Sequence, residues 1–164
     1  MAGARKTGRN EDYLEAIYKI VQKKGYAQVK DIAKVLNIGP SSVTEMMNKL
    51  SSEGLINYQK YGAVTMTPKG EKIGKRTWSK HVILRDFLMK LDIPQDLADE
   101  EACMIEHIIS DETLEKLTKF LEFSNMEDDP LWLDHFRHYC STGEYIRCTR
   151  ENRDSCPLHK LKGD

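Results

Sequence analysis

Apolar residues recur at the spacing of a helical face in the segments 10–25, 28–39 and 40–54. Pro40 stands where a first helical turn tolerates proline, and Gly54 stands where a helix commonly ends. Two helices joined by a tight turn that contains glycine form a helix-turn-helix arrangement. The second and third segments therefore predict that motif, with the first segment as a supporting helix.

The hydrophobic period changes in the segment 55–67, which reads as two short strands. The turn between them carries Lys60, Tyr61 and Gly62. Three helices followed by a small hairpin are the element order of a winged helix-turn-helix. We therefore predict such a DNA-binding domain over residues 1–70.

Helical spacing returns after the hairpin. The segment 68–91 predicts one long helix with a basic first half and an apolar second half, and 94–110 and 111–123 predict two more helices. Their large apolar faces suit a surface between two copies of the chain. The predicted fold class is mainly α, with an all-helical dimerisation domain over 71–124 after the winged helix.

The segment 125–164 has no clear period and is rich in metal-ligating residue types. These are His135, His138, Cys140, Cys148, Cys156 and His159. Seven residues separate successive cysteines, a wider spacing than the Cys-x-x-Cys pairs of zinc modules. Two interpretations stay open: a second metal site that holds Zn or an Fe–S cluster, or an aromatic plug on the dimerisation helices through Trp132, Phe136 and Tyr139.

Charge divides the chain into two unlike halves. Residues 1–80 hold 15 Lys and Arg against 7 Asp and Glu, a net charge of +8, and residues 81–164 hold 10 against 19, a net charge of −9. A basic first half favours a polyanion as partner. No apolar run is long enough to span a bilayer and no signal peptide is visible, so we expect a cytoplasmic protein without a membrane partner.

Cys103, Glu106 and His107 stand at positions i, i+3 and i+4, so a helix would point all three from one face. Taken alone, these three residues fit three interpretations: they bind a metal ion, they form a catalytic cluster, or they are ordinary core and surface residues. The three residues alone do not distinguish between these interpretations.

With these elements placed, the chain resembles the diphtheria-toxin-repressor family of metal-dependent transcriptional repressors, which includes iron-dependent repressors and manganese transport regulators. The resemblance covers residues 10–123 and rests on "EDYLEAIY", "GYAQVKDIAKVL", "PSSVTEMMNKL", "YGAVTMTPKGEKIGKR" and "EACMIEHIIS". The first four segments are most similar to the manganese branch, whose two-domain form lacks an SH3-like domain.

The resemblance implies a metal site where the first helix meets the dimerisation domain. Its ligands would be Asp12, Glu15, His81, Cys103, Glu106 and His107. Manganese regulators carry a carboxylate where Cys103 stands, and iron-type repressors carry methionine where Asp12 stands. The iron branch also has an ancillary site, but Arg85 and Asp99 occupy two of its positions and an arginine does not bind a cation.

Carboxylates and imidazole suit Mn(II) and Fe(II), and a thiolate adds affinity for softer ions. We therefore expect Fe(II), with Mn(II) close behind, as the activating ion. Operator DNA would be contacted by the recognition helix, the wing and the second helix. The residues are Lys30, Ser41, Ser42, Thr44, Glu45, Asn48, Lys49, Lys60 and Tyr61.

The main prediction is a homodimeric repressor, not an enzyme, that binds operator DNA when Fe(II) or Mn(II) activates it and so controls metal homeostasis genes. One alternative is a MarR-type winged-helix repressor that senses a small molecule and shows no metal dependence. The other is a metallohydrolase built on Cys103, Glu106 and His107, which leaves the basic wing unexplained.

Overall fold

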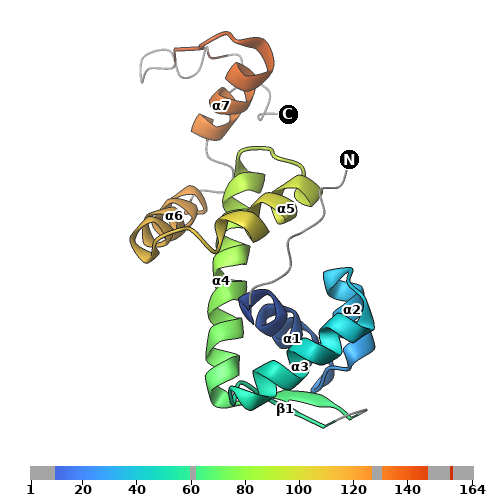
Figure 1. The fold of residues 1–164 in the computed structure, drawn as a ribbon. Coiled ribbons are helices and arrows are strands. Elements are labelled where there is room, and N and C mark those ends of the chain that lie inside the picture. Colours follow the sequence, from blue (N-terminus) through green and yellow to red (C-terminus); the bar gives the residue numbers. More distant parts are fainter. Residues whose placement is uncertain (1–9, 60–61, 127–130, 148–155, 157–164) are drawn as a thin grey trace. The chain divides into compact units, whose positions relative to one another are not determined.

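A computed structural model describes residues 10–59, 62–126, 131–147 and residue 156. The chain divides into two compact units, residues 1–82 and 83–164, which are taken in turn below (Figure 1). Among the described residues, no helix is both long and apolar enough to cross a membrane.

The first unit is a winged helix-turn-helix, as predicted. Its elements are α1 (Asn10–Lys24), α2 (Val29–Leu36), α3 (Pro40–Ser52), β1 (Ile56–Tyr58) and β2 (Val64–Met66). The strands pair antiparallel with Asn57 opposite Thr65. Asn37 ends α2 in the left-handed conformation (φ 54°), a role that asparagine fills more readily than most residues. Pro40 then begins α3 after an extended Gly39, which produces the sharp turn of the motif.

One hydrophobic core holds the first unit together. Its largest fully buried apolar side chains are Leu14, Ile17, Ile32, Met47, Leu50, Val43 and Val64. They come from the three helices and β2, which explains the helical spacing of apolar residues in the sequence. Complete burial of one such side chain contributes about 1.5–3 kcal/mol, so this core fixes the orientation of α3 within the unit.

The long helix α4 (Pro68–Lys90) begins against this core. Its first turns carry two glycines at points of close backbone approach. A Cβ at Gly74 would lie 2.6 Å from the carbonyl oxygen of Leu14, and one at Gly70 would overlap the carbonyl oxygen of Leu55. Glycine therefore lets α4 lie directly against the backbone of α1 and the loop before β1.

The second unit contains the end of α4 and three further helices: α5 (Gln95–Ile105), α6 (Asp111–Ser124) and α7 (Leu131–Thr142). Ser110 caps α6, because its hydroxyl accepts a hydrogen bond from the backbone N–H of Thr113. Edge-to-face ring contacts join Phe87 to Phe120 and Phe120 to Trp132, so aromatic packing connects α4, α6 and α7.

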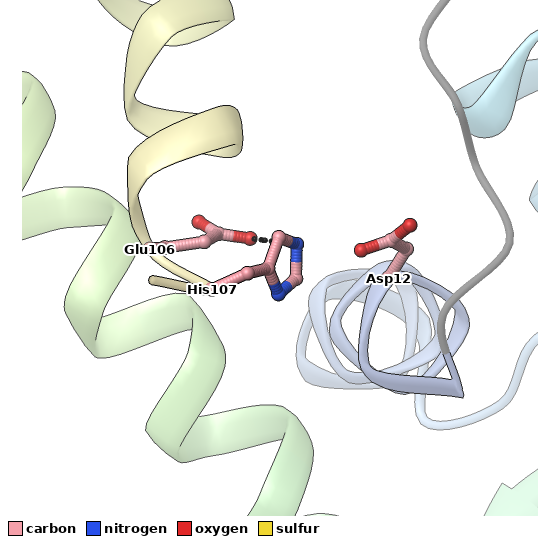
Figure 2. Close-up of side chains that lie close together, drawn as sticks. All are labelled: Asp12, Glu106 and His107. Carbon is pink, nitrogen blue, oxygen red and sulfur yellow. Dashed lines mark ion pairs between the residues drawn. The ribbon is translucent and has the colours of Figure 1, made fainter. Parts of the chain in front are cut away.

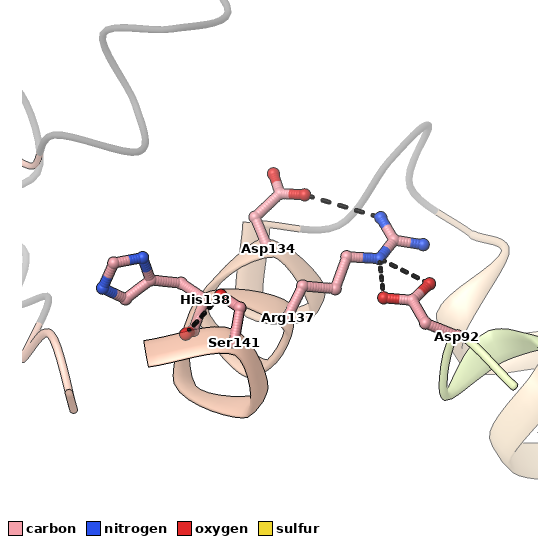
Figure 3. A network of polar contacts seen from close by, with 5 residues as sticks. All are labelled: Asp92, Asp134, Arg137, His138 and Ser141. Carbon is pink, nitrogen blue, oxygen red and sulfur yellow. Dashed lines mark hydrogen bonds and ion pairs between the residues drawn. The ribbon is translucent and has the colours of Figure 1, made fainter. Parts of the chain in front are cut away.

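The helix α7 lies in the tail, where the sequence showed no clear period and no element was predicted. Leu133 on this helix is buried, and Trp132 packs edge-to-face on Phe120. Exposed polar contacts add to this packing. Arg137 Nε lies 3.0 Å from both carboxylate oxygens of Asp92, in the turn after α4, and its Nη1 lies 3.6 Å from Asp134 (Figure 3).

Candidate metal centre and DNA-reading surface

The first unit contributes three of the six predicted metal ligands. Asp12 and Glu15 stand about one turn apart on α1, His81 lies on α4, and all three side chains are buried. One carboxylate oxygen of Glu15 lies within 4.8 Å of a ring nitrogen of His81. Carboxylate oxygens and an imidazole nitrogen are donor types that suit Mn(II) and Fe(II), and this corner of the unit brings them together.

Two further residues surround this pair. The indole ring of Trp78 stacks on the imidazole of His81, with ring centroids 5.2 Å apart and an angle of 18° between the planes. The ammonium group of Lys19 lies over the same indole ring, 4.2 Å from its centroid, and 3.7 Å from Glu15 Oε1. Stacking restricts the orientation of the His81 ring, and Lys19 places a positive charge beside the carboxylate.

The second unit contributes the other three ligands. Glu106 directly follows α5 and is buried, and His107 comes next in the chain (Figure 2). His107 Nε2 lies 3.4 Å from Glu106 Oε1. Cys103 lies one turn earlier on α5 and is half-buried. The Cys103, Glu106 and His107 trio therefore spans the last turn of α5 and the two residues after it.

Each unit thus carries an adjacent carboxylate and imidazole: Glu15 with His81, and Glu106 with His107.

Arg85, at a position of the ancillary site of the iron branch, instead forms an ion pair with Asp86, at 2.7 Å. Its guanidinium group occupies that position with a positive charge.

One tyrosine next to the predicted ligands has a shifted ionisation. Burial raises the pKa of the Tyr13 hydroxyl, and the negative charges of Asp12 and Glu45 raise it further. Tyr13 therefore remains neutral in the folded protein over a wider pH range than an exposed tyrosine.

The predicted DNA contacts divide by exposure. The exposed ones are Lys30, Ser41, Ser42, Glu45, Asn48 and Lys49. Thr44 is half-buried, and its hydroxyl donates to the carbonyl oxygen of Pro40. The ammonium group of Lys49 donates to Asn10 Oδ1, at 3.2 Å, which holds it near the start of α1. The wing residues Lys60 and Tyr61 lie outside the described residues.

The tail brings two of its six predicted ligands together. Cys156 is buried, and its Sγ lies 3.6 Å from His135 Nε2. His135 Nδ1 lies 3.1 Å from the carbonyl oxygen of Ile146. Because a carbonyl oxygen only accepts, Nδ1 carries the proton and Nε2 presents its lone pair to the thiol.

The remaining tail ligands are dispersed or undescribed. Cys140 is exposed, and His138 points away from Arg137 on the other side of α7 (Figure 3). Cys148 and His159 lie outside the described residues. In the described part of the tail, no three His, Cys, Asp or Glu side chains lie close enough to hold one ion.

The sequence reasoning did not identify Lys19 and Trp78 as neighbours of the predicted ligands. A signal was present, because Lys19 stands four residues after Glu15 and Trp78 three residues before His81, both on helices. Helical spacing predicts neighbours only within one helix. It therefore does not predict the contact of Lys19 on α1 with Trp78 on α4.

Comparison with known proteins gives two matching family models. One, iron dependent repressor, N-terminal DNA binding domain, matches residues 7–64, and the other, iron dependent repressor, metal binding and dimerisation domain, matches residues 67–130. The transcriptional regulator MntR of Lysinibacillus sphaericus (strain C3-41) is 39% identical over 120 residues, which are 73% of this chain and 85% of the relative. MntR of Bacillus subtilis (strain 168) is 36% identical over 118 residues, 72% of this chain and 83% of the relative.

A solved structure of the manganese regulator SloR has a similar fold. Its TM-score is 0.62 at 34% identity, and the match covers 71% of this chain and 55% of that one. The matching region is therefore little more than half of SloR.

Proposed function

The chain belongs to the iron-dependent repressor family, and we propose that one divalent cation, bound by residues of both its units, switches its affinity for operator DNA. A member of this family is a metal-dependent transcriptional repressor and not an enzyme. It has a DNA-binding domain and a metal-binding and dimerisation domain. The ligand set, the ion and the manner of switching are our proposals.

One observation carries the proposal: each unit has a carboxylate beside an imidazole. Glu15 with His81 supplies two donors from the first unit, and Glu106 with His107 supplies two from the second. Asp12 and Cys103 would complete the set. The donor chemistry fits a divalent transition-metal ion, because carboxylate oxygens and imidazole nitrogens together suit Mn(II) and Fe(II).

For the activating ion we propose Fe(II) or Mn(II). SloR is named as a manganese regulator, and the hard donors Asp12, Glu15 and Glu106 suit that ion. Cys103 is a soft donor and shifts the preference toward Fe(II). The thiol and the imidazoles must lose protons to bind, so metal affinity falls as the pH is lowered.

The mechanism follows from where the donors reside. Asp12, Glu15 and His81 of the first unit and Cys103, Glu106 and His107 of the second would hold the ion, and such shared binding would restrict the angle between the winged helix and the dimerisation helices. In a twofold dimer this would set the spacing of the two copies of α3 against DNA half-sites about one helical turn, roughly 34–36 Å, apart. A coupling on the order of 1–3 kcal/mol changes operator affinity several-fold to a hundredfold.

A DNA mobility-shift assay on the metal-free full chain tests the proposal. We expect Fe(II) or Mn(II) to strengthen operator binding and a chelator to reverse it. Glu106→Gln removes one donor charge with little change in shape, so it should abolish the response while the dimer stays folded. Glu112→Gln makes the same chemical change at an exposed position of α6 and is the matched control. Metal-independent binding by the wild-type protein would instead favour a sensor of the MarR type.

For the tail we propose a separate Zn(II) site that includes His135 and Cys156. Zinc bonds of about 2.3 Å to sulfur and about 2.0–2.1 Å to nitrogen, at tetrahedral angles, set the two donor atoms about 3.5 Å apart. The 3.6 Å between Cys156 Sγ and His135 Nε2 supports this assignment. The Nδ1 contact of His135 with a backbone carbonyl is also typical of ligating histidines.

Cobalt(II) serves as a spectroscopic probe for this tail site. In a Cys103→Ser background the primary site has no thiolate, so a sulfur-to-cobalt charge-transfer band must come from the tail. Cys156→Ser should remove that band. Cys140→Ser, a change at the exposed cysteine of α7, should leave it. A band that survives Cys156→Ser, or no band at all, contradicts the tail site.

A further inference from the structure

A lysine is built into the first-unit half of the proposed metal site. Lys19 Nζ lies 3.7 Å from Glu15 Oε1, and the Lys19 side chain is 34% exposed while that of Glu15 is 9% exposed. Lys19 stands four residues after Glu15 on α1, so both side chains leave the same face of the helix. An ammonium group thus already partners the carboxylate that we propose as a metal ligand.

A second contact keeps Lys19 in this position. Its ammonium group lies 4.2 Å from the centroid of the Trp78 ring, within the range of a cation–π interaction. The same indole ring stacks on His81 at 5.2 Å. One aromatic ring therefore positions both the lysine and the imidazole ligand. A lysine with only a solvent-exposed ion pair could swing away freely, whereas this one loses the aromatic contact if it does.

We propose that Lys19 sets the metal affinity of this protein, so that the chain responds only above a threshold concentration of the ion. The inference rests on the proposed metal site. Without metal, the Lys19 ammonium group compensates the charge of Glu15 and stabilises the carboxylate in its buried position. When a divalent cation binds Glu15, the same ammonium group faces a double positive charge, and its repulsion or displacement weakens binding.

The size of the effect follows from charge and exposure. Two like charges a few ångströms apart repel strongly in a medium of low dielectric and only weakly in water. Because Lys19 is about one-third exposed, solvent screens part of this repulsion. We expect Lys19→Gln to tighten Mn(II) binding by roughly five- to twentyfold. Added salt should narrow the difference between this variant and the wild-type protein.

The experiment measures Mn(II) affinity of the full chain by following free Mn(II) with electron paramagnetic resonance. Lys19→Gln should bind more tightly than wild type, and Lys19→Arg, which keeps the charge and the aromatic contact, should remain close to wild type. Lys23→Gln is the matched control, because it removes the same charge one turn further along α1 at an exposed position. It should change Mn(II) affinity less than twofold.

Fluorescence provides a readout that does not depend on DNA binding. The chain has two tryptophans, so Trp132→Phe leaves Trp78 as the sole emitter. Metal binding at Glu15 and His81 should change Trp78 emission, and the midpoint of that change should shift to lower Mn(II) concentration in Lys19→Gln. Thermal unfolding followed by circular dichroism verifies that each variant is folded.

The outcomes separate the two proposals. Wild-type protein that binds Mn(II), together with a folded Lys19→Gln variant of equal or weaker affinity, overturns the role of Lys19 and leaves the metal site standing. If Lys23→Gln tightens Mn(II) binding as much as Lys19→Gln does, the effect comes from the overall charge of the protein. That result also overturns the role of Lys19. Wild-type protein that binds none of the divalent ions overturns the proposed function itself.

Discussion

The Glu15 carboxylate and the His81 imidazole lie within 4.8 Å of each other, one on α1 and the other on α4. The pair depends on the glycine at position 74, where a Cβ would lie 2.6 Å from the Leu14 carbonyl oxygen. Close packing of the two helices thus places two proposed ligands side by side within the winged-helix unit.

Substitution of Gly74 tests this packing. Gly74→Ala forces a methyl group against the α1 backbone, and we expect it to lower the free energy of unfolding by about 1–3 kcal/mol, a typical cost of overpacking. Chemical denaturation followed by circular dichroism measures the change. Gly39→Ala is the control, because a Cβ at Gly39 meets nothing within 4 Å. Equal stability of the two variants would show that α1 and α4 are not in close contact.

Cys103 is expected to control metal selectivity. Cys103→Asp replaces a soft donor with a hard one, so affinity for Mn(II) should rise relative to Co(II) and Zn(II), by about tenfold in the ratio of affinities. Competition between Mn(II) and Co(II) for the metal-free protein measures that ratio. Cys140→Asp places the same change at an exposed cysteine outside the site. An unchanged ratio in Cys103→Asp would remove Cys103 from the ligand set.

The raised pKa of Tyr13 predicts a loss of stability in alkali. Burial, Asp12 and Glu45 all disfavour the tyrosinate in the fold, so its folded pKa lies above the unfolded value of about 10. The fold therefore keeps this contribution below pH about 10 and loses it as the pH rises toward and through the folded pKa. Unfolding free energies of wild type and Tyr13→Phe, measured between pH 8 and about 11, should diverge at the alkaline end. Parallel curves would contradict the shift.

The second unit exposes large apolar side chains that fit a dimer surface. Ile108 is 77% exposed and Phe123 is 64% exposed. We propose that a second copy of the chain covers them, in line with the matched dimerisation domain. The double variant Ile108→Lys with Phe123→Lys should shift the protein from dimer to monomer in analytical ultracentrifugation. Tyr145→Lys, a change at a comparably exposed aromatic residue, tests whether any added charge has this effect. A double variant that remains fully dimeric would place the interface elsewhere.

Much of the fold is predictable from the chain because local signals agree with tertiary packing. Apolar spacing defines α1 to α6, and residues such as Pro40 and Ser110 mark where helices begin. No helix was predicted over α7, and its contacts include pairs far apart in sequence, such as Arg137 with Asp92, which helical spacing does not predict. The division into 1–70, 71–124 and 125–164 stays a prediction, as does a cytoplasmic location.

The candidate site is harder to predict than the fold for a physical reason. Ligand type and helical spacing suggest Cys103, Glu106 and His107, but spacing does not indicate which side chains of other helices lie beside them. The contact of Trp78 with Lys19, which joins α4 to α1, is one that spacing does not indicate, and the stacked geometry of Trp78 on His81 is another. These contacts restrict the His81 ring and hold a positive charge near it.

The most direct test of the central claim is a titration of the metal-free protein with Mn(II), and separately with Fe(II) under anaerobic conditions, while operator affinity is followed by fluorescence anisotropy. We predict that either ion raises wild-type affinity several-fold to a hundredfold and that the rise is absent in Glu106→Gln and in His107→Ala, with dimer and fold intact. A normal metal response in both variants would contradict the account.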